Sequence, residues 1–363
     1  MTQSTHLVSQ VDTEIAEFLA SREPILVAVA DELSFFTDFS RDLLSGGKRF
    51  RARFCIAGWQ ATSTLAQAEE ETAVITLAAA LEVFHSAALV HDDIIDNSDT
   101  RRGMPAAHIR FAALHRDQKF VGSADTFGRA SAILHGDLLL GWSDELVDVA
   151  LDLLTDRGRA RSTRAEFNRM RTEVTVGQYL DILEENAWPT VPDTETIRRA
   201  ERVMTFKSAK YSVEAPLALG ALIGGASAAQ LQSLRRFGLP LGLAFQLRDD
   251  VLGVFGDAAV TGKPAGDDLR EGKRTVLVAL ARQTMGEPQR EAFDDALGRP
   301  DLDDTTIADL QQQIEFSGAL ESAERSIASY TTQALDALRA ADLEREAVAE
   351  LEHLARLLTE RSS

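Results

Sequence analysis

Residues 74–96 read VITLAAALEVFHSAALVHDDIID, an apolar run that ends in three aspartates. Large apolar side chains recur in it every three or four residues, as at Val74, Leu77 and Leu81. This spacing predicts a helix with an apolar face. The same spacing recurs at Leu138, Trp142, Leu146 and Val149. Alternating patterns and Asn-Gly turns, which are typical of strands, are absent over any useful length, so the sequence predicts an all-α fold.

The chain has 363 residues, of which 45% are hydrophobic and 26% charged, a composition typical of a soluble globular protein. Clusters of Gly, Pro, Asp and Ser predict breaks between helices at 45–47, 97–105, 155–161, 186–193, 256–272 and 298–304. Neither a fixed-period repeat nor a domain boundary is evident. We therefore expect one helical bundle over residues 1–363, in which helices within 1–40 precede the motif-bearing region.

Charge and hydropathy exclude several classes of protein. A formal net charge of -19 argues against nucleic-acid binding, which requires a positive face. Nearly uncharged stretches such as 216–226 are shorter than the roughly 20 apolar residues that span a bilayer. The N-terminus lacks the charged and apolar regions of a signal peptide, so we expect a cytoplasmic protein without a transmembrane segment. Its one cysteine, Cys55, excludes an internal disulfide and a Cys-based zinc site.

The first aspartate cluster has the spacing of a metal site. On a helix, Asp92 and Asp96 project from one face, whereas Asp93 points partly away. Two carboxylates suit Mg²⁺, which completes its shell with waters and phosphate oxygens. Arg101 and Arg102 follow closely, and two guanidinium groups can clamp phosphate oxygens. These cations favour a phosphate site over an ordinary acidic helix end.

A second cluster, 157 residues further along the chain, has a similar character. Gln246, Asp249 and Asp250 stand at helical spacings i, i+3 and i+4 and are expected to share a face. Lys263 and Lys273 follow, each preceded by a glycine that permits close approach to an anion. A single Gly-Lys pair is weak support, because most such pairs are only turns.

Two further groups of residues become candidates for the site only when they are considered together with the two aspartate clusters. Lys48 and Arg51 lie at the expected start of a helix, where free N–H groups attract anions. On its own this segment reads as a solvated basic turn. His85 lies on the same expected helix as Asp92, and taken alone it reads as an ordinary helix histidine.

In these motifs the sequence resembles the trans-isoprenyl diphosphate synthases, and most closely the actinobacterial geranylgeranyl diphosphate synthases. The match runs from about Gly46 to Lys273. It rests on ordered elements: Gly46-Gly47-Lys48-Arg49-Phe50-Arg51, the first aspartate cluster with Arg101-Arg102-Gly103, Gly136-Asp137, Gly177-Gln178 with Asp181, Lys207-Ser208, and Phe245-Gln246 before the second cluster. The resemblance implies an all-α bundle of the isoprenoid synthase type with a central active-site cavity.

The resemblance also implies a role for each matching residue. The diphosphate of isopentenyl diphosphate would be held by Lys48, Arg51, His85 and Arg102. The allylic diphosphate (dimethylallyl, geranyl or farnesyl) would be held by Arg101, Lys207, Lys263 and Lys273, with Ser208 and Gln246 lining its site. Two Mg²⁺ ions would be bound by Asp92 and Asp96, and a third by Asp249 with Asp250 assisting. A homodimer is likewise implied by the resemblance.

One position departs from the family pattern. The second motif often ends in a third aspartate, and here that position is Gly253. The departure puts in doubt a protein acid at the third metal. It does not remove the site, because Mg²⁺ fills vacant positions with water.

Product length is expected to depend on the helix that precedes Asp92. Ala88 and Ala87, four and five residues earlier, leave the cavity open, and Phe84 is the first large residue that could close it. At about 1.5 Å rise per residue, three to four residues add roughly one isoprene unit. This favours a C20 geranylgeranyl product over C15 farnesyl, and Ala87→Phe is expected to shorten it.

Other functions stay open at this point. A farnesyl or longer-chain synthase would share all these motifs. A class I terpene cyclase would not require the Lys48, Arg51 and Arg102 set, because it acts on a single diphosphate. A noncatalytic subunit that modulates another synthase is supported only by Gly253, and activity of the isolated chain would exclude it.

Overall fold

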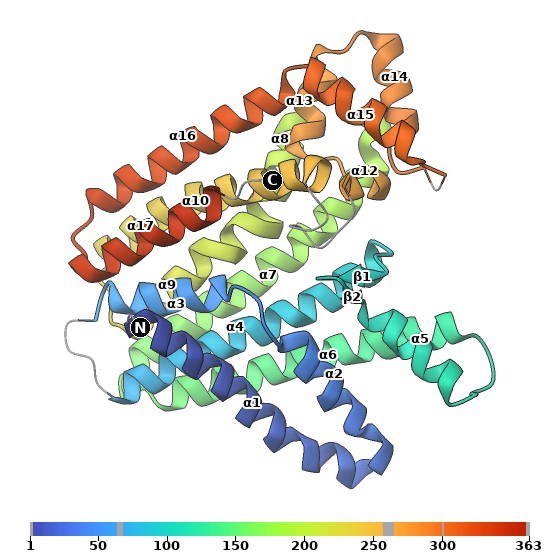
Figure 1. The fold of residues 1–363 in the computed structure, drawn as a ribbon. Helices are drawn as coiled ribbons and strands as arrows, with labels where there is room; N and C mark the ends of the chain where they lie inside the picture. The colour runs from blue at the N-terminus through green and yellow to red at the C-terminus, as the bar shows by residue number, and fades with distance from the viewer. Residues whose placement is uncertain (1–2, 64–67, 257–264, 300, 361–363) are drawn as a thin grey trace. The chain divides into compact units, whose positions relative to one another are not determined.

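Helices form nearly all of the structure, a computed structural model that describes residues 3–63, 68–256, 265–299 and 301–360 (Figure 1). Within those ranges the only strands are β1 (Thr100–Arg101) and β2 (Met104–Pro105). They pair antiparallel, with Arg101 opposite Met104. The all-α class is therefore confirmed, with one small hairpin that the sequence analysis did not foresee.

The chain forms two compact units, which we describe one at a time. Unit 1 comprises Met1–Arg164 and Leu219–Ala226, and unit 2 comprises Ala165–Ala218 and Ser227–Ser363. Helices α7 (Arg157–Ala187) and α9 (Ala215–Ile223) each contribute residues to both units. The expectation of one domain over residues 1–363 stays a prediction.

Unit 1 is built around α4 (Ala68–Ile95), which packs against α6 (Ala124–Asp152). Every residue from Ala73 to Phe84 is buried, so this part of the helix is enclosed on all sides rather than on one apolar face. The remaining elements that lie wholly in unit 1 are α1 (Gln3–Val29), η1 (Asp31–Leu33), α2 (Ser34–Leu44), α3 (Phe50–Gln60) and α5 (Ala107–Asp117). Of these, α1, α2, α3 and α5 all contact α4 as well.

Helix α4 differs from the expectation that the apolar stretches of this chain are too short to span a bilayer. By length and composition it could cross a membrane, with a mean hydropathy of 1.9 over an 18-residue window. It is therefore a longer apolar stretch than residues 216–226. Because 83% of that window is buried inside the protein, α4 has the character of a core helix.

The second predicted stripe is only partly right. Trp142 and Leu146 are buried in α6, whereas Val149 is 51% exposed. Leu139 and Ala150 are buried instead. The face of α6 that packs inward is therefore rotated slightly from the one expected.

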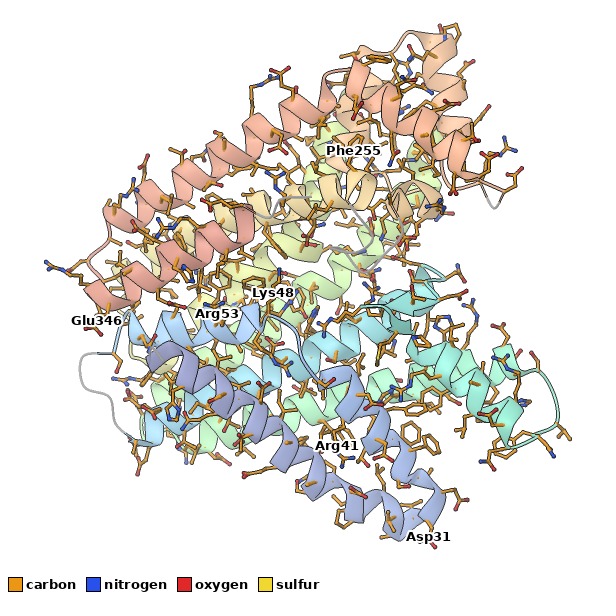
Figure 2. The ribbon with its side chains drawn as sticks, viewed as in Figure 1. Asp31, Arg41, Lys48, Arg53, Phe255 and Glu346 are labelled. Atoms are coloured by element: carbon orange, nitrogen blue, oxygen red, sulfur yellow. The ribbon has the colours of Figure 1, made fainter. Side chains whose placement is uncertain are left out.

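Unit 2 contains the long helix α10 (Ala228–Phe255), whose last residue is labelled in Figure 2. It packs against α16 (Ala319–Arg339) and against η4 (Met204–Glu214), an eleven-residue π-helix that precedes α9. The other elements are η2 (Trp188–Thr190), η3 (Asp193–Glu195), α8 (Thr196–Val203), α12 (Asp267–Glu271), α13 (Val276–Thr284), α14 (Glu287–Ala296), α15 (Asp304–Phe316) and α17 (Arg345–Thr359). One apolar core joins residues of α10, α12, α13, α14, α15 and α16.

Most predicted breaks between helices are observed. The break at 45–47 separates α2 from α3, and the break at 97–105 separates α4 from α5. The break predicted at 155–161 is shorter, because α7 already begins at Arg157. That at 256–272 is interrupted by α12, and its residues 257–264 lie outside the described chain.

Candidate active site

The first aspartate motif lies at the C-terminal end of α4. The helix ends at Ile95, and the Asp96 N–H still donates to the Asp92 carbonyl at 2.8 Å, which continues the helical turn. Asp92 and Asp96 are therefore one turn apart, as predicted. Asp93 is only 2% exposed, so its carboxylate points inward.

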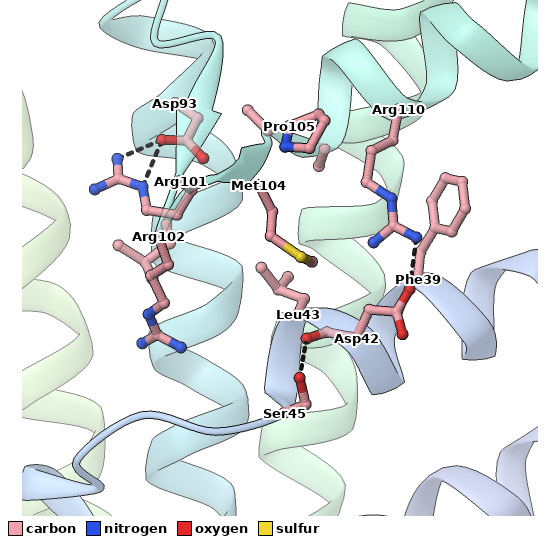
Figure 3. Close-up of a pocket in the computed structure, with 13 residues that line it drawn as sticks. Phe39, Asp42, Leu43, Ser45, Asp93, Arg101, Arg102, Met104, Pro105 and Arg110 are labelled. Atoms are coloured by element: carbon pink, nitrogen blue, oxygen red, sulfur yellow. Dashed lines mark hydrogen bonds and ion pairs between the residues drawn. The ribbon is translucent and has the colours of Figure 1, made fainter. Parts of the chain in front are cut away.

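The hairpin after α4 places Arg101 against these acids. Arg102 and Gly103 form its turn, with φ angles of 53° and 74°, and positive φ at both central residues matches the right-handed twist of a hairpin. The Arg101 guanidinium donates to Asp93 through Nε at 2.8 Å, as Figure 3 shows. It also donates to Asp92 through Nη2 at 3.2 Å. The structure thus joins Arg101 to the first motif through Asp92 and also through Asp93, the acid that was assigned no role.

The turn before α3 carries the second basic element. Gly46 and Gly47 have φ angles of 67° and 87°, which favour glycine. A side chain at Gly47 would bring its Cβ within 3.3 Å of the Arg102 guanidinium. The glycine pair therefore lets this turn approach Arg102. Lys48 is exposed beside it, and Figure 2 labels it just before α3.

Two residues that the sequence analysis missed hold this turn in place. Arg49 is buried, with a φ of 51°, and pairs with Asp12 at 2.8 Å and with Glu82 at 3.5 Å. The other Glu82 oxygen accepts from the Ala52 N–H at 3.1 Å, in the first turn of α3. Glu82 could have been noticed, because a lone carboxylate inside a wholly apolar stretch is almost always paired.

His85 marks the point where the cations of unit 1 converge. Burial holds the pKa of this imidazole well below its usual value, and the charges of Arg51 and Arg102 lower it further. Arg101 and Arg49 act in the same direction. Four guanidinium groups thus lie near this imidazole, and two of them, those of Arg49 and Arg101, are also paired with carboxylates.

The contacts of Gly136 and Asp137 give a structural reason for the Gly136-Asp137 motif. A Cβ there would lie 2.4 Å from the Nε2 atom of His91, the residue before Asp92. Asp137, the next residue, has a carboxylate oxygen 3.4 Å from the same nitrogen. The Gly136-Asp137 pair thus supports the end of α4.

Unit 1 also contains a cavity of about 200 Å³ beside the hairpin. Its apolar lining includes Leu43, Leu89 and Met104 (Figure 3). Arg101 and Arg102 line it, whereas Lys48, Arg51 and His85 do not. This cavity therefore lies next to the predicted isopentenyl diphosphate site without containing it.

The second aspartate motif lies near the C-terminal end of α10 in unit 2. Gln246 donates to the Asp250 carboxyl at 2.8 Å. Asp250 is buried, and burial, followed by the charge of Asp268, raises its pKa to about 8. Asp249 is partly exposed on the same helix.

Lys207 and Ser208 lie on the π-helix η4. π-Helical turns are rare and occur frequently at functional sites. The Lys207 ammonium pairs with Asp181 of α7. A Cβ at Gly177 would lie 2.5 Å from the Lys207 backbone nitrogen, so this glycine lets α7 contact η4 closely. The Gly177 and Asp181 motif therefore supports Lys207.

The two predicted loop lysines have different outcomes. Lys263 lies outside the described residues. Lys273 follows α12 directly, and its ammonium is 2.5 Å from Glu271 and 3.9 Å from Asp268. The structure thus brings Lys273 and Lys207 into unit 2 with the second motif, while the first motif and its cations belong to unit 1.

The acids of both motifs fit Mg²⁺ without forming a complete shell. In the described part of the chain, no three His, Cys, Asp or Glu side chains are placed to hold one metal together. Mg²⁺ is usually bound by one or two carboxylates plus waters and substrate phosphates. The hard oxygen donors Asp92, Asp96 and Asp249 meet that requirement.

Comparisons with known proteins point to one family. The family model described as polyprenyl synthetase matches residues 34–314. The chain is similar to the crystal structure of a geranylgeranyl pyrophosphate synthase from Corynebacterium glutamicum, complexed with isoprenyl diphosphate and magnesium. The identity is 38% and the TM-score 0.90, over 98% of this chain and 99% of that one.

Curated relatives give the same result. The chain is 30% identical to a short chain isoprenyl diphosphate synthase of Methanocaldococcus jannaschii, over 81% of this chain and 84% of the relative. It is 31% identical to a geranylgeranyl diphosphate synthase of Saccharolobus solfataricus, over 80% and 77% of the two chains.

Proposed function

The chain belongs to the polyprenyl synthetase family, and from this premise we propose that it is a geranylgeranyl diphosphate synthase. The family and the all-α fold expected from the sequence are thereby confirmed. In the proposed reaction the allylic C–O bond breaks and diphosphate leaves. A C–C bond forms to isopentenyl diphosphate, which then loses a proton. The main product is the C20 diphosphate.

One observation carries this proposal. Arg51, Arg101 and Arg102 converge on His85, within two helical turns of Asp92. A diphosphate needs such a cluster, because its charge must be neutralised when it is taken from water. Because burial and the neighbouring guanidinium groups hold the pKa of His85 low, its imidazole would offer the diphosphate a hydrogen bond rather than a charge. We assign Arg51, His85 and Arg102 of this cluster, with Lys48, to isopentenyl diphosphate.

The allylic diphosphate is assigned to the cations of unit 2 and to Arg101. Lys207 and Lys273 are held by acids of their own unit, which fixes where each ammonium points. Ser208 and Gln246 would line this site, and Lys263 would complete it. Neutralising the leaving diphosphate is the main task of these residues, because charge builds on it as the C–O bond breaks.

Mg²⁺ is part of the proposal. When bound, it supplies Lewis-acid stabilisation of the leaving diphosphate. Asp92 and Asp96 would hold two ions and Asp249, assisted by Asp250, a third, giving about three ions that keep waters in their shells. Asp93 would keep Arg101 oriented, because their groups are already paired.

The product length and the assembly belong to the proposal as well. Small Ala87 and Ala88 with Phe84 beneath them favour C20, with farnesyl diphosphate as the nearest alternative product. We also propose a homodimer, which the resemblance implies, and a cytoplasmic location, which the N-terminal sequence favours. The Corynebacterium enzyme, named for the C20 product, supports this choice at 38% identity.

The proposal is tested with the purified chain alone. It is incubated with Mg²⁺, isopentenyl diphosphate and, in turn, dimethylallyl, geranyl or farnesyl diphosphate, and product length is measured by mass spectrometry. C20 diphosphate is expected from each primer. If none is extended the enzymatic proposal fails, and the noncatalytic subunit becomes the better account.

A further inference from the structure

Lys273, one of the cations assigned to the allylic diphosphate, lies in the link 272–275 between α12 and α13. Its ammonium pairs with Glu271 at 2.5 Å, but a flexible lysine side chain has a fixed end only if its backbone is fixed as well. Gly272 fixes the first part of the link. It has a φ of 74°, and a Cβ there would lie 2.9 Å from the Cα of Gly298, so the backbone packs closely against the turn after α14.

The other part of the link is fixed through Arg274, the residue after Lys273. The Arg274 side chain is only 11% exposed, and its Nη1 donates to Oδ1 of Asp294 at 2.5 Å. Arg282 of α13 donates to both oxygens of the same carboxylate at 2.8 Å. One buried acid of α14 therefore joins the link to α13.

Trp188 covers the guanidinium of Arg274. The guanidinium carbon lies 3.9 Å from the centre of the Trp188 ring, well within the roughly 6 Å over which a ring face attracts a cation. Asp294 is shared with Arg282, and burial lowers the pKa of Arg274 although Asp294 opposes that shift. The carboxylate thus does not offset the whole cost of burying Arg274, and the face of Trp188 supplies a further attraction.

Trp188 is placed by α7, because η2 begins directly after the last residue of that helix. About two turns earlier on α7, Asp181 pairs with Lys207, the other described lysine assigned to the allylic diphosphate. The end of α7 and the residue after it therefore hold Lys207 directly and hold the link that carries Lys273 indirectly. One stretch of chain supports both lysines.

We propose that Trp188 is a positioning residue for the allylic diphosphate: its ring holds Arg274 against Asp294 and so fixes the backbone that carries Lys273. The inference rests on the proposed function, which assigns Lys273 to that diphosphate. Trp188 acts through Arg274 and does not itself contact the substrate. A charge that is already in place costs no reorganisation when the diphosphate binds, so loss of the ring weakens allylic binding.

The test measures binding of an allylic analogue. A non-hydrolysable geranyl bisphosphonate is titrated calorimetrically into the protein in excess Mg²⁺. Trp188→Leu, which stays apolar but lacks a ring face, is expected to weaken binding about tenfold. Trp188→Phe, which keeps a ring face, is expected to bind within about threefold of wild type. In steady-state kinetics Trp188→Leu should raise the KM for geranyl diphosphate and leave that for isopentenyl diphosphate within about twofold.

A double-mutant cycle shows whether Trp188 acts through Lys273. Lys273→Met removes the ammonium and keeps the length of the side chain. In that background Trp188→Leu is expected to change the affinity by less than about twofold, because the charge that it positions is gone. Val191→Ala is the matched control, because Val191 lines the same small cavity as Trp188 and Arg274. It is expected to leave the affinity unchanged.

The outcomes separate this inference from the proposed function. Wild-type affinity in Trp188→Leu overturns the inference. So does a loss that is equally large in the Lys273→Met background or in Val191→Ala, because Trp188 would then only stabilise unit 2. Wild-type affinity in Lys273→Met overturns it as well, by removing the cation that it concerns. Primer extension by the wild-type protein leaves the proposed function standing in each case, and only its absence defeats that function.

Discussion

Two neighbouring alanines of α4 differ in burial, and this difference decides which of them is the better position for testing product length. Ala87 is completely buried, whereas Ala88 keeps partial exposure and lies one turn before Asp92. A phenylalanine at Ala87 would overpack the core of unit 1, which typically costs about 1–3 kcal/mol. Ala88 is therefore the better place to test the chain-length hypothesis.

We expect Ala88→Phe to shorten the main product by at least one isoprene unit, because its ring would project along the row that carries Asp92. Phe84→Ala should lengthen the product, because it removes the first large side chain of that row. Product length is read by mass spectrometry with dimethylallyl diphosphate as primer. Ala20→Phe, at an exposed position of α1, is the control. An unchanged C20 product from Ala88→Phe would contradict the hypothesis.

At the scale of elements, the start of α3 depends on an acid of α4. Glu82, only 5% exposed, accepts from Ala52 and pairs with Arg49, and together they set the turn that presents Lys48 and Arg51. We expect Glu82→Gln to raise the KM for isopentenyl diphosphate about tenfold, a change of about 1.4 kcal/mol in binding. The KM for the allylic substrate should stay within about twofold, because its cations do not depend on this turn.

Steady-state kinetics with each substrate varied in turn checks this prediction. Glu69→Gln, on the exposed first turn of the same helix, is the matched control. Equal rises in both KM values would mean that Glu82 only stabilises the fold. The positioning role would then be wrong.

The packing of α6 on α2 and α5 predicts a pH dependence of stability. His135 bonds Ser40 at 2.8 Å and contacts the rings of Phe36 and Phe111. Burial lowers its pKa to about 4, with a further contribution from Arg110. The unfolded chain, with a histidine pKa of about 6.5, therefore binds more protons than the folded one between these values.

Stability from His135 is therefore full above pH 6.5 and is lost as the pH falls toward 4. The loss is about 1.4 kcal/mol per pH unit, or up to about 3 kcal/mol in all. Urea unfolding of wild type and His135→Gln at pH 7 and pH 4.5 measures it. The wild type should lose more stability than the variant over that interval. Equal losses would show that His135 already carries a proton in the folded state.

At the scale of the whole molecule, the single domain expected from the sequence can be tested by unfolding. Helices α7 and α9 carry residues of both units, and a continuous helix couples the residues along it. The three tryptophans divide between the units, with Trp59 and Trp142 in unit 1 and Trp188 in unit 2.

We expect both units to unfold in one transition. The fluorescence of Trp188, in a protein with Trp59→Phe and Trp142→Phe, should report the same urea midpoint as far-UV circular dichroism. Coincident midpoints are the mark of two-state unfolding. Two separate midpoints would show that the units are independent domains.

The sequence was sufficient for features that depend on local spacing. Asp92 and Asp96 were placed on one turn because their separation fixes their direction on a helix. The predicted stripe on α6 failed at Val149, because period alone does not say which side of a helix meets its neighbour. Arg49 was missed because a charge in a basic turn carries no sign of burial.

The sequence by itself determined the helical class, the positions of the motif residues and the strong negative charge, since each follows from composition or from separations of a few residues. Only the tertiary structure decided that Glu82 anchors α3, that Asp93 holds Arg101 and that Asp268 fills the space beside Gly253. These contacts join residues 8 to 30 positions apart in the chain through the packing of separate elements. The physical reason is that a helical repeat fixes where a side chain points, whereas packing fixes what it meets.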